Sequence, residues 1–380
     1  IRDTDRSRGL GDVYKRQALI DAFKSVKDAG KPVVVHIVTL KGKGYKPAEE
    51  DKETWHWHMP FDIKTGKPPM DFDGEDYSSV TAEYLLDKMK KDKSVVAITS
   101  ATPTVMGFTA DKRHEAGSQF VDVGIAEETA VALASGIAAG GGKPVYGVYS
   151  SFIQRTYDQL SQDLCINNNP ATIIVYAASV YGMNDVTHLG IYDIPMISNI
   201  PNLVYLAPTT KEEYLAMLEW SIEQNEHPVA IRVPGGEMIS DGKKVSKDFS
   251  ELNRYEITEK GSKIAIIGLG SFYGLACKTA KEIESRTGVK ATLINPYYIT
   301  GIDGKLLESL KADHDVVITL EDGMLDGGFG EKIARFYGNS DVKVFNYGLK
   351  KEFLDRYDVN EVLKENHLTP EQIADDLSLQ

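Results

Sequence analysis

Apolar residues in this chain occur either at helical spacing or in short continuous runs. Residues 18–29 place apolar side chains at helical spacing, and a β-branched run follows at 32–40. A run that is apolar along both faces is typical of a strand in a parallel sheet covered by helices. Residues 45–76, which follow, are rich in Pro, Gly, Lys and Asp. This composition indicates a connecting segment. We therefore predict a helix, a buried strand and a connection over residues 18–76.

The next stretch, residues 77–237, alternates apolar runs with helical patterns. An alanine-rich helix is predicted at 125–140, because acids occupy its first turn and a glycine run ends it. The alternation predicts a doubly wound α/β domain with a parallel sheet. The strands are predicted at 94–100, 119–124, 143–149, 171–177 and 203–208.

A polar linker at 238–256 separates this domain from a third part, residues 257–380. Helical and strand patterns alternate again in the third part, which predicts a second α/β domain with a parallel sheet. Its glycine run at 266–274 lacks the GxGxxG spacing of a dinucleotide site, so a structural turn is favoured there over a nucleotide site. The predicted fold class is thus α/β throughout, with doubly wound parallel-sheet domains.

The first 17 residues differ from the rest of the chain. They contain four arginines and have neither an apolar export core nor the pattern of a transit peptide. We expect residues 1–17 to be a leader outside the fold, either a cloning or assembly artefact or a disordered tail.

Composition narrows the classes of partner. The formal net charge is -13, which disfavours nucleic acid and anionic membrane surfaces. Two distant cysteines, Cys165 and Cys277, form no metal motif and fit a reducing cytoplasm. The apolar runs are far shorter than the roughly 20 residues that cross a bilayer. We expect a cytoplasmic protein that acts on small molecules.

Candidate chemical groups follow two predicted strands. Glu127 comes just after one strand, and Tyr149, Phe152 and Arg155 follow another. Ligands of open parallel sheets bind at the carboxyl ends of the strands, where an aromatic ring and a guanidinium can stack on a ring and hold an anion. For Glu127 alone, the favourable interaction of an acid with a helix amino terminus is an alternative explanation.

Two histidines lie in predicted polar loops. His56 belongs to TWHWHMPFD and His188 to NDVTHLGIYD. Each is either an ordinary surface residue or a proton-transfer group, because imidazole titrates near neutrality. Lys41 and Lys43, in LKGKGYK, suit a diphosphate or form a solvated basic loop.

Several segments together resemble a known enzyme family. The family is the 1-deoxy-D-xylulose-5-phosphate synthases, thiamine-diphosphate enzymes related to transketolase, and the resemblance covers residues 18–378. No single motif carries it, because GIAEE alone would also allow transketolase. The segments, in family order, are HIVTLKGKGYKPAEED, WHWHMPFDIKTG, FVDVGIAEE, YSSFIQRTYDQ, THLGIYD and TLEDGMLDGGFGE.

The resemblance implies a role for each candidate residue. Glu127 matches the cofactor-activating glutamate, since a carboxyl in a low-dielectric pocket can share a proton with the aminopyrimidine ring. His56 and His188 match histidines that move protons at carbonyl groups. The implied cofactor contacts are Phe152, Tyr45 and Ile125, and the implied acceptor contacts are Tyr149, Arg155, Asn184 and Asp185.

The same resemblance implies the reaction and the partners. The expected reaction joins pyruvate to D-glyceraldehyde 3-phosphate with decarboxylation, giving 1-deoxy-D-xylulose 5-phosphate, an isoprenoid and thiamine precursor. Thiamine diphosphate and Mg²⁺ are the expected cofactors. The metal ligands are expected in an amino-terminal part that this chain lacks, so the chain alone is expected to be inactive. A homodimer is expected, with the third part as the transketolase carboxy-terminal domain.

Three departures from the family pattern keep alternatives open. Gly235 and Ala177 occupy positions where the family has arginines, and Asn184 replaces an acid that here lies one residue later, at Asp185. A lost charged contact costs on the order of 1.5–3 kcal/mol. The alternatives are a transketolase-like transferase with another aldehyde acceptor, a dehydrogenase beta-type subunit, or a scaffold without catalysis. The segment at 40–51 disfavours the dehydrogenase subunit.

Overall fold

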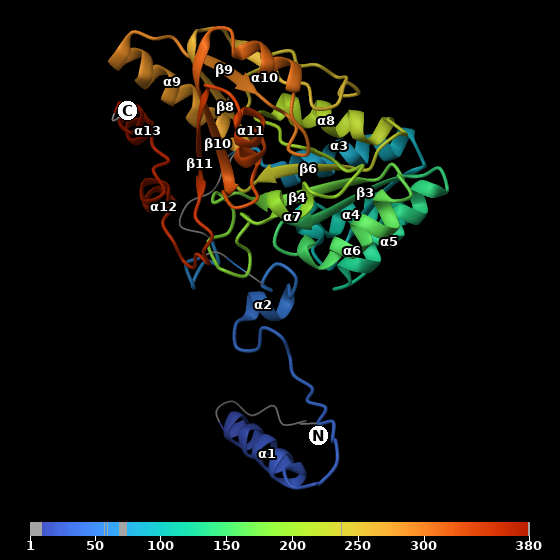
Figure 1. Ribbon diagram of the computed structural model, residues 1–380. Coiled ribbons are helices and arrows are strands. Elements are labelled where there is room, and N and C mark those ends of the chain that lie inside the picture. The colour runs from blue at the N-terminus through green and yellow to red at the C-terminus, as the bar shows by residue number, and fades with distance from the viewer. Residues whose placement is uncertain (1–9, 57, 59, 68–73, 237, 379–380) are drawn as a thin grey trace. The chain divides into compact units, whose positions relative to one another are not determined.

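The computed structural model describes residues 10–56, 58, 60–67, 74–236 and 238–378 (Figure 1). The chain divides into unit one, residues 1–73, and unit two, residues 74–380. Part of the predicted leader, residues 1–9, and part of the predicted connection, residues 68–73, lie outside the described residues.

Unit one contains two helices. Helix α1 spans Leu10–Val26 and helix α2 spans Lys46–Glu50. Helix α1 includes residues 10–17 of the predicted leader, and the interpretation of that leader as an artefact or a tail stays a prediction. Residues 12–17 contain neither proline nor glycine, so no residue there favours a break in the helix.

The apolar run at 32–40 does not form the predicted buried strand. No residue of this run is in a strand, and Val34 and Val38 are 93% and 71% exposed. A strand is stable only when its backbone groups pair with a neighbour. The described residues of unit one contain no second strand to supply that pairing, which explains the difference.

The first sheet of unit two is entirely parallel and has six strands. Its order is β2-β1-β3-β4-β6-β5, which confirms a doubly wound domain. The strands are β1 (Val95–Thr99), β2 (Phe120–Asp122), β3 (Lys143–Tyr149), β4 (Thr172–Ala178), β5 (Val204–Leu206) and β6 (Val229–Pro234).

Helices cover both faces of this sheet. Side chains of α5 pack with one core cluster, and those of α3 and α8 pack with another. Asp76 caps α3 by accepting a hydrogen bond from the Ser79 backbone N–H at 2.7 Å. The helices are α3 (Tyr77–Lys91), α4 (Ala110–Ala116), α5 (Glu127–Ala139), α6 (Tyr157–Gln159), α7 (Asp193–Ile197) and α8 (Lys211–Glu223).

Strand β6 was not among the sequence-predicted strands. Its centre carries Arg232, which interrupts the apolar run. Arg232 is nevertheless 2% exposed, because Asp193 and Asp322 accept hydrogen bonds from its guanidinium. A buried charge is tolerated only with such partners, so tertiary pairing overrides the local pattern.

The second sheet confirms the predicted α/β domain with a parallel sheet, to which one antiparallel edge strand is added. Its order is β11-β10-β8-β9-β7, and the edge strand β7 runs antiparallel to β9. An antiparallel edge is common on otherwise parallel sheets. The strands are β7 (Glu256–Glu259), β8 (Lys263–Gly268), β9 (Thr292–Asn295), β10 (His314–Met324) and β11 (Lys343–Leu349).

Helices cover the second sheet on both faces as well. In Figure 1, α9 and α13 lie side by side at the carboxy-terminal end of the fold. Ala276 and Ile283 of α9 join one core cluster, whereas Phe329 and Ile333 of α11 join another. The helices are α9 (Tyr273–Thr287), α10 (Gly304–Leu310), α11 (Phe329–Tyr337), α12 (Val359–Glu365) and α13 (Pro370–Ser378).

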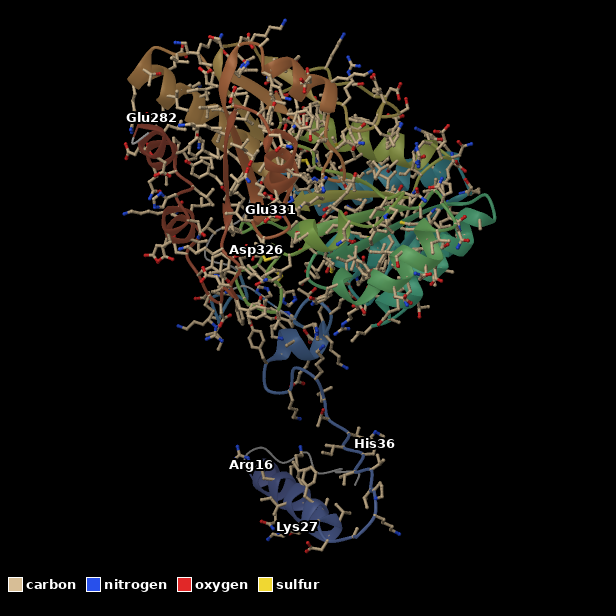
Figure 2. The ribbon with its side chains drawn as sticks, in the orientation of Figure 1. Arg16, Lys27, His36, Glu282, Asp326 and Glu331 are labelled. Carbon is tan, nitrogen blue, oxygen red and sulfur yellow. The ribbon has the colours of Figure 1, made fainter. Side chains whose placement is uncertain are left out.

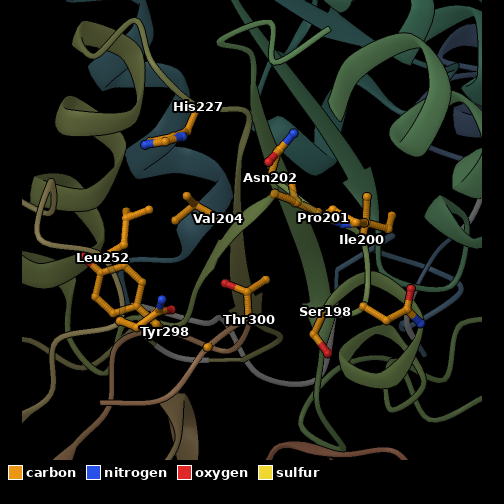
Figure 3. Close-up of a pocket in the computed structure, with 13 residues that line it drawn as sticks. Ser198, Ile200, Pro201, Asn202, Val204, His227, Leu252, Tyr298 and Thr300 are labelled. Atoms are coloured by element: carbon orange, nitrogen blue, oxygen red, sulfur yellow. The ribbon is translucent and has the colours of Figure 1, made fainter. Parts of the chain in front are cut away.

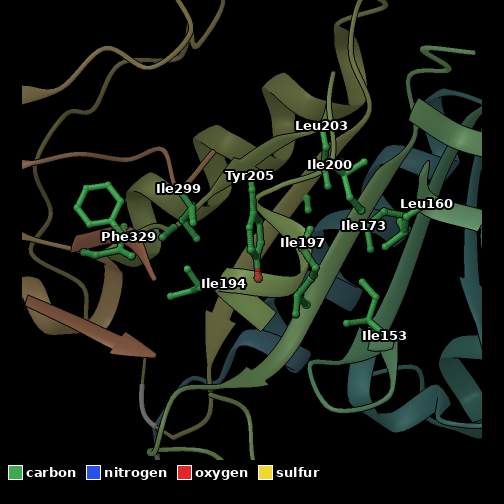
Figure 4. Packing of buried hydrophobic residues seen from close by; sticks show 14 of the residues in the cluster. Ile153, Leu160, Ile173, Ile194, Ile197, Ile200, Leu203, Tyr205, Ile299 and Phe329 are labelled. Atoms are coloured by element: carbon green, nitrogen blue, oxygen red, sulfur yellow. The ribbon is translucent and has the colours of Figure 1, made fainter. Parts of the chain in front are cut away.

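The two sheets share a hydrophobic core. Figure 4 shows Ile194, Tyr205, Ile299 and Phe329 of this cluster, which contains side chains from both sheets and their helices. The Tyr205 ring is fully buried, and its hydroxyl donates a hydrogen bond to the Asp193 carboxylate. The two domains of unit two are therefore joined by apolar packing as well as by the Arg232 ion pairs.

Acidic side chains are common on the outer surface of unit two. Glu282 on α9 forms an ion pair with Arg286, Asp326 pairs with Lys351, and Glu331 of α11 is exposed (Figure 2). Across the part of the chain that the structure describes, no helix is both long and apolar enough to cross a membrane.

Candidate active site

The candidate site lies at the carboxyl ends of neighbouring parallel strands. Strand β2 ends at Asp122, β3 at Tyr149 and β4 at Ala178. These ends lie along one edge of the sheet because the strands run in the same direction. The connections that leave them carry Glu127, Phe152 and His188, so the fold brings these three side chains to a single edge.

Glu127 is the first residue of α5 and is only 2% exposed. Its Oε2 lies 3.4 Å from Nη1 of Arg155, whose side chain is 56% exposed. At this length the contact is weak, so the carboxyl group retains hydrogen-bonding capacity. A buried carboxyl with spare capacity is suited to a polar group of a ligand.

Three rings, those of Tyr149, Phe152 and His188, meet at this edge of the sheet. The centroid of the Tyr149 ring lies 5.2 Å from that of Phe152 and 5.4 Å from that of His188. The Phe152 and His188 centroids are 5.1 Å apart. Burial, and to a smaller degree the Asp185 charge, raises the pKa of Tyr149, so its phenol stays protonated near neutral pH. Ile125, two residues before Glu127 in the sequence, is 79% exposed.

His188 is held by an acidic neighbour. Its Nδ1 lies 2.9 Å from Oδ1 of Asp185, and Thr187 Oγ1 also donates a hydrogen bond to that oxygen. Burial acts to raise the pKa of Asp185, but hydrogen bonds from Thr187 and His188 outweigh it and hold that pKa below its ordinary value. An ionised carboxylate only accepts hydrogen bonds. Nδ1 therefore carries the hydrogen, which leaves Nε2 of neutral His188 with a lone pair.

Asn184 and Asp185 lie in different environments. The Asn184 side chain donates a hydrogen bond at 3.3 Å to the carbonyl oxygen of Tyr357. Asp185, in contrast, contacts His188 directly. In this structure the acid one residue along the chain is the group that supports the histidine, while Asn184 contacts the carboxy-terminal domain.

The candidate residues of unit one form a cluster of their own. The Tyr45 ring lies 4.9 Å from Trp55 and 5.9 Å from Phe61. Lys41 Nζ and His56 Nδ1 are within hydrogen-bonding distance. These contacts organise the turn after the apolar run within unit one.

The two positions that lack the expected arginines both lie against Gly182, in the loop after β4. A Cβ atom placed on Gly235 would lie 2.4 Å from Cα of Gly182. A Cβ atom on Gly182 would lie 2.6 Å from the carbonyl oxygen of Ala177. Backbone of the loop after β4 thus fills the space beside Gly235, and no larger side chain fits there without a backbone shift.

Sequence reasoning missed several features of this edge. Ala177 and Ser179 have φ angles of 52° and 76°, a left-handed conformation that is costly for residues other than glycine. The hydroxyls of Ser150 and Ser151 are buried without a partner among the described residues. The paired serines of YSSF were a visible signal for the hydroxyls, but no sequence pattern predicts the backbone angles.

A separate hollow lies elsewhere in unit two (Figure 3). It has a volume of about 360 Å³ and includes Asn202, His227 and Tyr298 in its lining. Asn202 precedes β5 and His227 precedes β6. Because these are amino ends of parallel strands, the hollow is at the opposite edge of the sheet from Glu127.

Family models match both domains of unit two. Residues 74–238 match the transketolase pyrimidine-binding domain, and residues 253–373 match the transketolase carboxy-terminal domain. The chain belongs to the transketolase family. The resemblance seen in the sequence motifs is thereby confirmed.

Among curated relatives of this transketolase-family chain are 1-deoxy-D-xylulose-5-phosphate synthases. That of Clostridium perfringens (strain SM101) is 36% identical over 372 residues, covering 97% of this chain and 59% of the relative. That of Halothermothrix orenii is 38% identical over 348 residues, covering 90% of this chain and 54% of the relative. The chain thus spans less than two thirds of the length of these relatives.

Solved transketolase structures share the fold. A split-gene transketolase, described as an inactive beta4 tetramer, aligns with a TM-score of 0.64 at 21% identity, covering 78% of this chain and 95% of that one. A Pichia stipitis transketolase in complex with sedoheptulose 7-phosphate aligns with a TM-score of 0.63 at 16% identity, covering 80% and 45%. At these identities the likeness shows the fold alone.

The transketolase family is thiamine-diphosphate dependent, and the residues present fit the ring side of that cofactor. Glu127 offers a buried carboxyl group, Phe152 an aromatic face, and Ser150 and Ser151 unpartnered buried hydroxyls. For a metal, the described residues contain no group of three or more His, Cys, Asp or Glu side chains that could hold an ion.

Proposed function

We propose that this chain provides the pyrimidine-binding and carboxy-terminal domains of an enzyme that transfers a two-carbon unit from pyruvate to an aldehyde. The proposed acceptor is D-glyceraldehyde 3-phosphate, and the product is 1-deoxy-D-xylulose 5-phosphate. The observation that carries the proposal is the buried Glu127 carboxyl at the sheet edge, next to Arg155. The names of the curated relatives support the choice of substrates.

Glu127, Phe152, Ile125 and Tyr45 are the proposed cofactor contacts. Bound thiamine diphosphate would supply the electron sink for decarboxylation, together with Mg²⁺. Glu127 would share a proton with a ring nitrogen, because its carboxyl is buried yet has only one long contact. Phe152 would offer its aromatic face to the ring.

His188 is the proposed proton carrier at the substrate carbonyl oxygen. The Asp185 carboxylate accepts from Nδ1, so Nε2 is free to accept a proton and later return it. His56 is proposed to act similarly, from unit one. Arg155 is proposed to hold the acceptor anion, while Tyr149, Asn184 and Asp185 line its site.

A second candidate acceptor class is favoured by the loop beside Gly235. Neither Gly235 nor Ala177 carries charge, and backbone of Gly182 occupies the space next to Gly235. A phosphate would therefore rely on Arg155, which is already in contact with Glu127. An aldehyde without phosphate is consequently the second candidate, and comparison of the two acceptors is part of the test.

Small-molecule substrates, a homodimer and a cytoplasmic location are part of the proposal. The net charge of -13 repels polyanions. Analytical sedimentation with and without cofactor measures the oligomeric state of the protein. A monomer at working concentration in the active protein would remove the dimer from the proposal.

The decisive experiment measures carbon dioxide release from pyruvate by this chain completed with a family diphosphate-binding domain. Glu127→Gln is expected to lower release by about a hundredfold or more, since proton transfer contributes that much. Glu128→Gln is the matched control, because Glu128 is adjacent but exposed. Equal release by the two variants contradicts the proposed role of Glu127.

The acceptor and the scaffold alternative have their own measurements. Release that rises with glyceraldehyde 3-phosphate supports the synthase reaction, and release that rises only with unphosphorylated glyceraldehyde supports the second candidate. For this chain alone, thiamine diphosphate with Mg²⁺ at a hundredfold excess over its dissociation constant would stabilise a real site by about 2.7 kcal/mol. Absence of any shift, combined with no release, favours a scaffold.

A further inference from the structure

The histidine loop, residues 179–192, lies against a segment of the carboxy-terminal domain. This segment, residues 352–358, connects β11 to α12. It is mostly exposed, with Tyr357 as its half-buried ring. The two stretches are far apart in sequence, yet they make contacts along most of the length of the histidine loop.

The first half of the histidine loop is held by Tyr357 and its neighbour. The Tyr357 hydroxyl shares its one hydrogen between the carbonyl oxygens of Val180 at 3.1 Å and Met183 at 3.5 Å. Asn184 returns a hydrogen bond to the Tyr357 carbonyl, and the Arg356 N–H donates to the Asn184 carbonyl. Burial raises the pKa of Tyr357 to about 12, so the hydroxyl remains a donor at physiological pH.

The second half of the loop is held by Asp355 and Glu352. The Val186 backbone N–H donates to Oδ1 of Asp355 at 3.1 Å. The Tyr192 hydroxyl donates to the carbonyl oxygen of Glu352 at 2.6 Å, and its ring lies 5.9 Å from that of Phe353. His188 therefore lies between anchored residues on both sides.

The loop needs such external restraint. Its base is closed by the Ser179 N–H, which donates to the Gly190 carbonyl at 2.7 Å. Ser179, and Ala177 just before it, have left-handed backbone angles, which persist only when the surroundings impose them. Between the base and the Asp185 turn, the backbone carbonyls of Val180, Met183 and Asn184 are bonded to the 352–358 segment.

We propose that the 352–358 segment is a positioning element, through which the carboxy-terminal domain sets the orientation of His188. Tyr357 and Asp355 are the positioning residues, and they act through the loop backbone without contacting the reacting atoms. Catalytic groups must be held close to their productive geometry by supporting residues. The catalytic consequence rests on the proposed function of His188, whereas the restraint itself does not.

The restraint is tested by hydrogen exchange on this chain. Tyr357→Phe keeps the ring and removes both hydroxyl bonds, so amides of residues 183–188 are expected to exchange about tenfold faster. Tyr347→Phe is the matched control, because its hydroxyl bonds to Asp376 within the carboxy-terminal domain. Unchanged exchange of residues 183–188 in Tyr357→Phe overturns the proposal.

A surface pair of variants provides an independent test. Asp355 is half exposed, so its substitution leaves the core intact. Asp355→Ala removes the acceptor for the Val186 N–H, and Asp355→Asn restores an oxygen there. We expect faster exchange in the alanine variant and recovery in the asparagine variant. Equal exchange in both variants contradicts the role of Asp355.

The orientation of His188 has a spectroscopic signature. Ring nitrogen shifts in ¹⁵N spectra report which nitrogen carries the hydrogen, and Nδ1 is expected to carry it in the parent chain. Tyr357→Phe is expected to mix the two tautomers, whereas Tyr347→Phe is not. In the completed enzyme, Tyr357→Phe should lower kcat while leaving the KM for pyruvate unchanged. Altered exchange and tautomer with unaltered kcat would retain the restraint and refute the proposed role of His188.

Discussion

Two apolar segments of similar composition have opposite surroundings in this chain. Strand β4 at Thr172–Ala178 lies between β3 and β6, and its Ile173, Ile174 and Val175 side chains are completely buried. The run at 32–40 in unit one is in no strand, and Val34 and Val38 are largely exposed. The comparison teaches that an apolar run becomes a strand only where neighbouring strands satisfy its backbone.

Units one and two should also differ in how much they contribute to the stability of the chain. In unit two, apolar side chains contact others in closed clusters. In unit one, Ile20 and Phe23 of α1 are 45% and 49% exposed. Stability of the chain should therefore depend strongly on unit two and weakly on the exposed run of unit one.

The largest expected effect is at the ion pairs inside unit two. Asp322→Ala leaves the buried Arg232 with Asp193 as its remaining carboxylate, and such a loss costs about 3–5 kcal/mol. Urea unfolding of the chain measures it. Asp326→Ala is the control, because its ion pair with Lys351 is exposed and should contribute at most about 1 kcal/mol. Similar losses in both variants would contradict the buried network.

A paired substitution addresses the comparison directly. Ile174→Ala removes a fully buried side chain from β4 and is expected to cost about 2–5 kcal/mol. Val34→Ala, in the exposed run, is expected to change the free energy of unfolding by less than about 0.5 kcal/mol. The urea concentrations at the unfolding midpoints of the two variants measure this difference. A large loss for Val34→Ala would show that the run is covered in solution.

The stability of unit two should depend on pH through Glu321, a fully buried residue of strand β10. Burial raises the pKa of Glu321 from 4.5 to about 8, although the Phe329 and Gly330 N–H groups donate to it. Between these values the folded chain binds a proton that the unfolded chain releases, so stability falls as pH rises through this window. The melting temperature should therefore be lower at pH 8 than at pH 5.5.

Glu321→Gln should flatten that decline, and Glu331→Gln, at an exposed position in the following helix α11, is the control. Above pH 8 the trend should reverse, because burial lowers the pKa of Lys332 from 10.5 to about 8. There the folded chain has released a proton that the unfolded chain still binds, so stability rises with pH. An unchanged slope in Glu321→Gln would exclude Glu321 as the source.

The smallest expected effect is at the start of unit two. Asp76→Ala removes the side-chain cap of α3 and should cost about 1 kcal/mol. Asp87→Ala serves as control, since Asp87 pairs with Lys90 on an exposed helix face. Thermal unfolding should show a lower midpoint for the cap variant. Indistinguishable midpoints would mean that the helix end is dispensable.

Local sequence pattern predicted five of the six strands of the first sheet but failed where tertiary contacts determine the structure. Strands β3 and β4 each lie between two parallel neighbours, and both were predicted within one residue. Strand β6 was missed because its central residue, Arg232, is charged. The two carboxylates that allow its burial, those of Asp193 and Asp322, are far from it in the sequence. The antiparallel direction of β7 was equally invisible, since direction depends on the pairing with β9.

The candidate site shows the same division. Placement after strand ends pointed to Glu127, Phe152 and Arg155, and the structure places Glu127 and Arg155 in contact. Their catalytic roles stay predictions. The contact of the histidine loop with Tyr357 could not be predicted from the sequence, because Tyr357 lies 177 residues after Val180 in the chain.

The Arg232 network also constrains how such chains can be recombined. Arg232 belongs to the pyrimidine-binding domain, and Asp322 belongs to the carboxy-terminal domain. A crossover within the 238–256 linker would join a guanidinium from one parent to whatever residue the other parent has at position 322. Chimeras from parents that differ there would leave the buried Arg232 with Asp193 as its remaining carboxylate, so compatible exchange requires an acidic residue at position 322 in both parents.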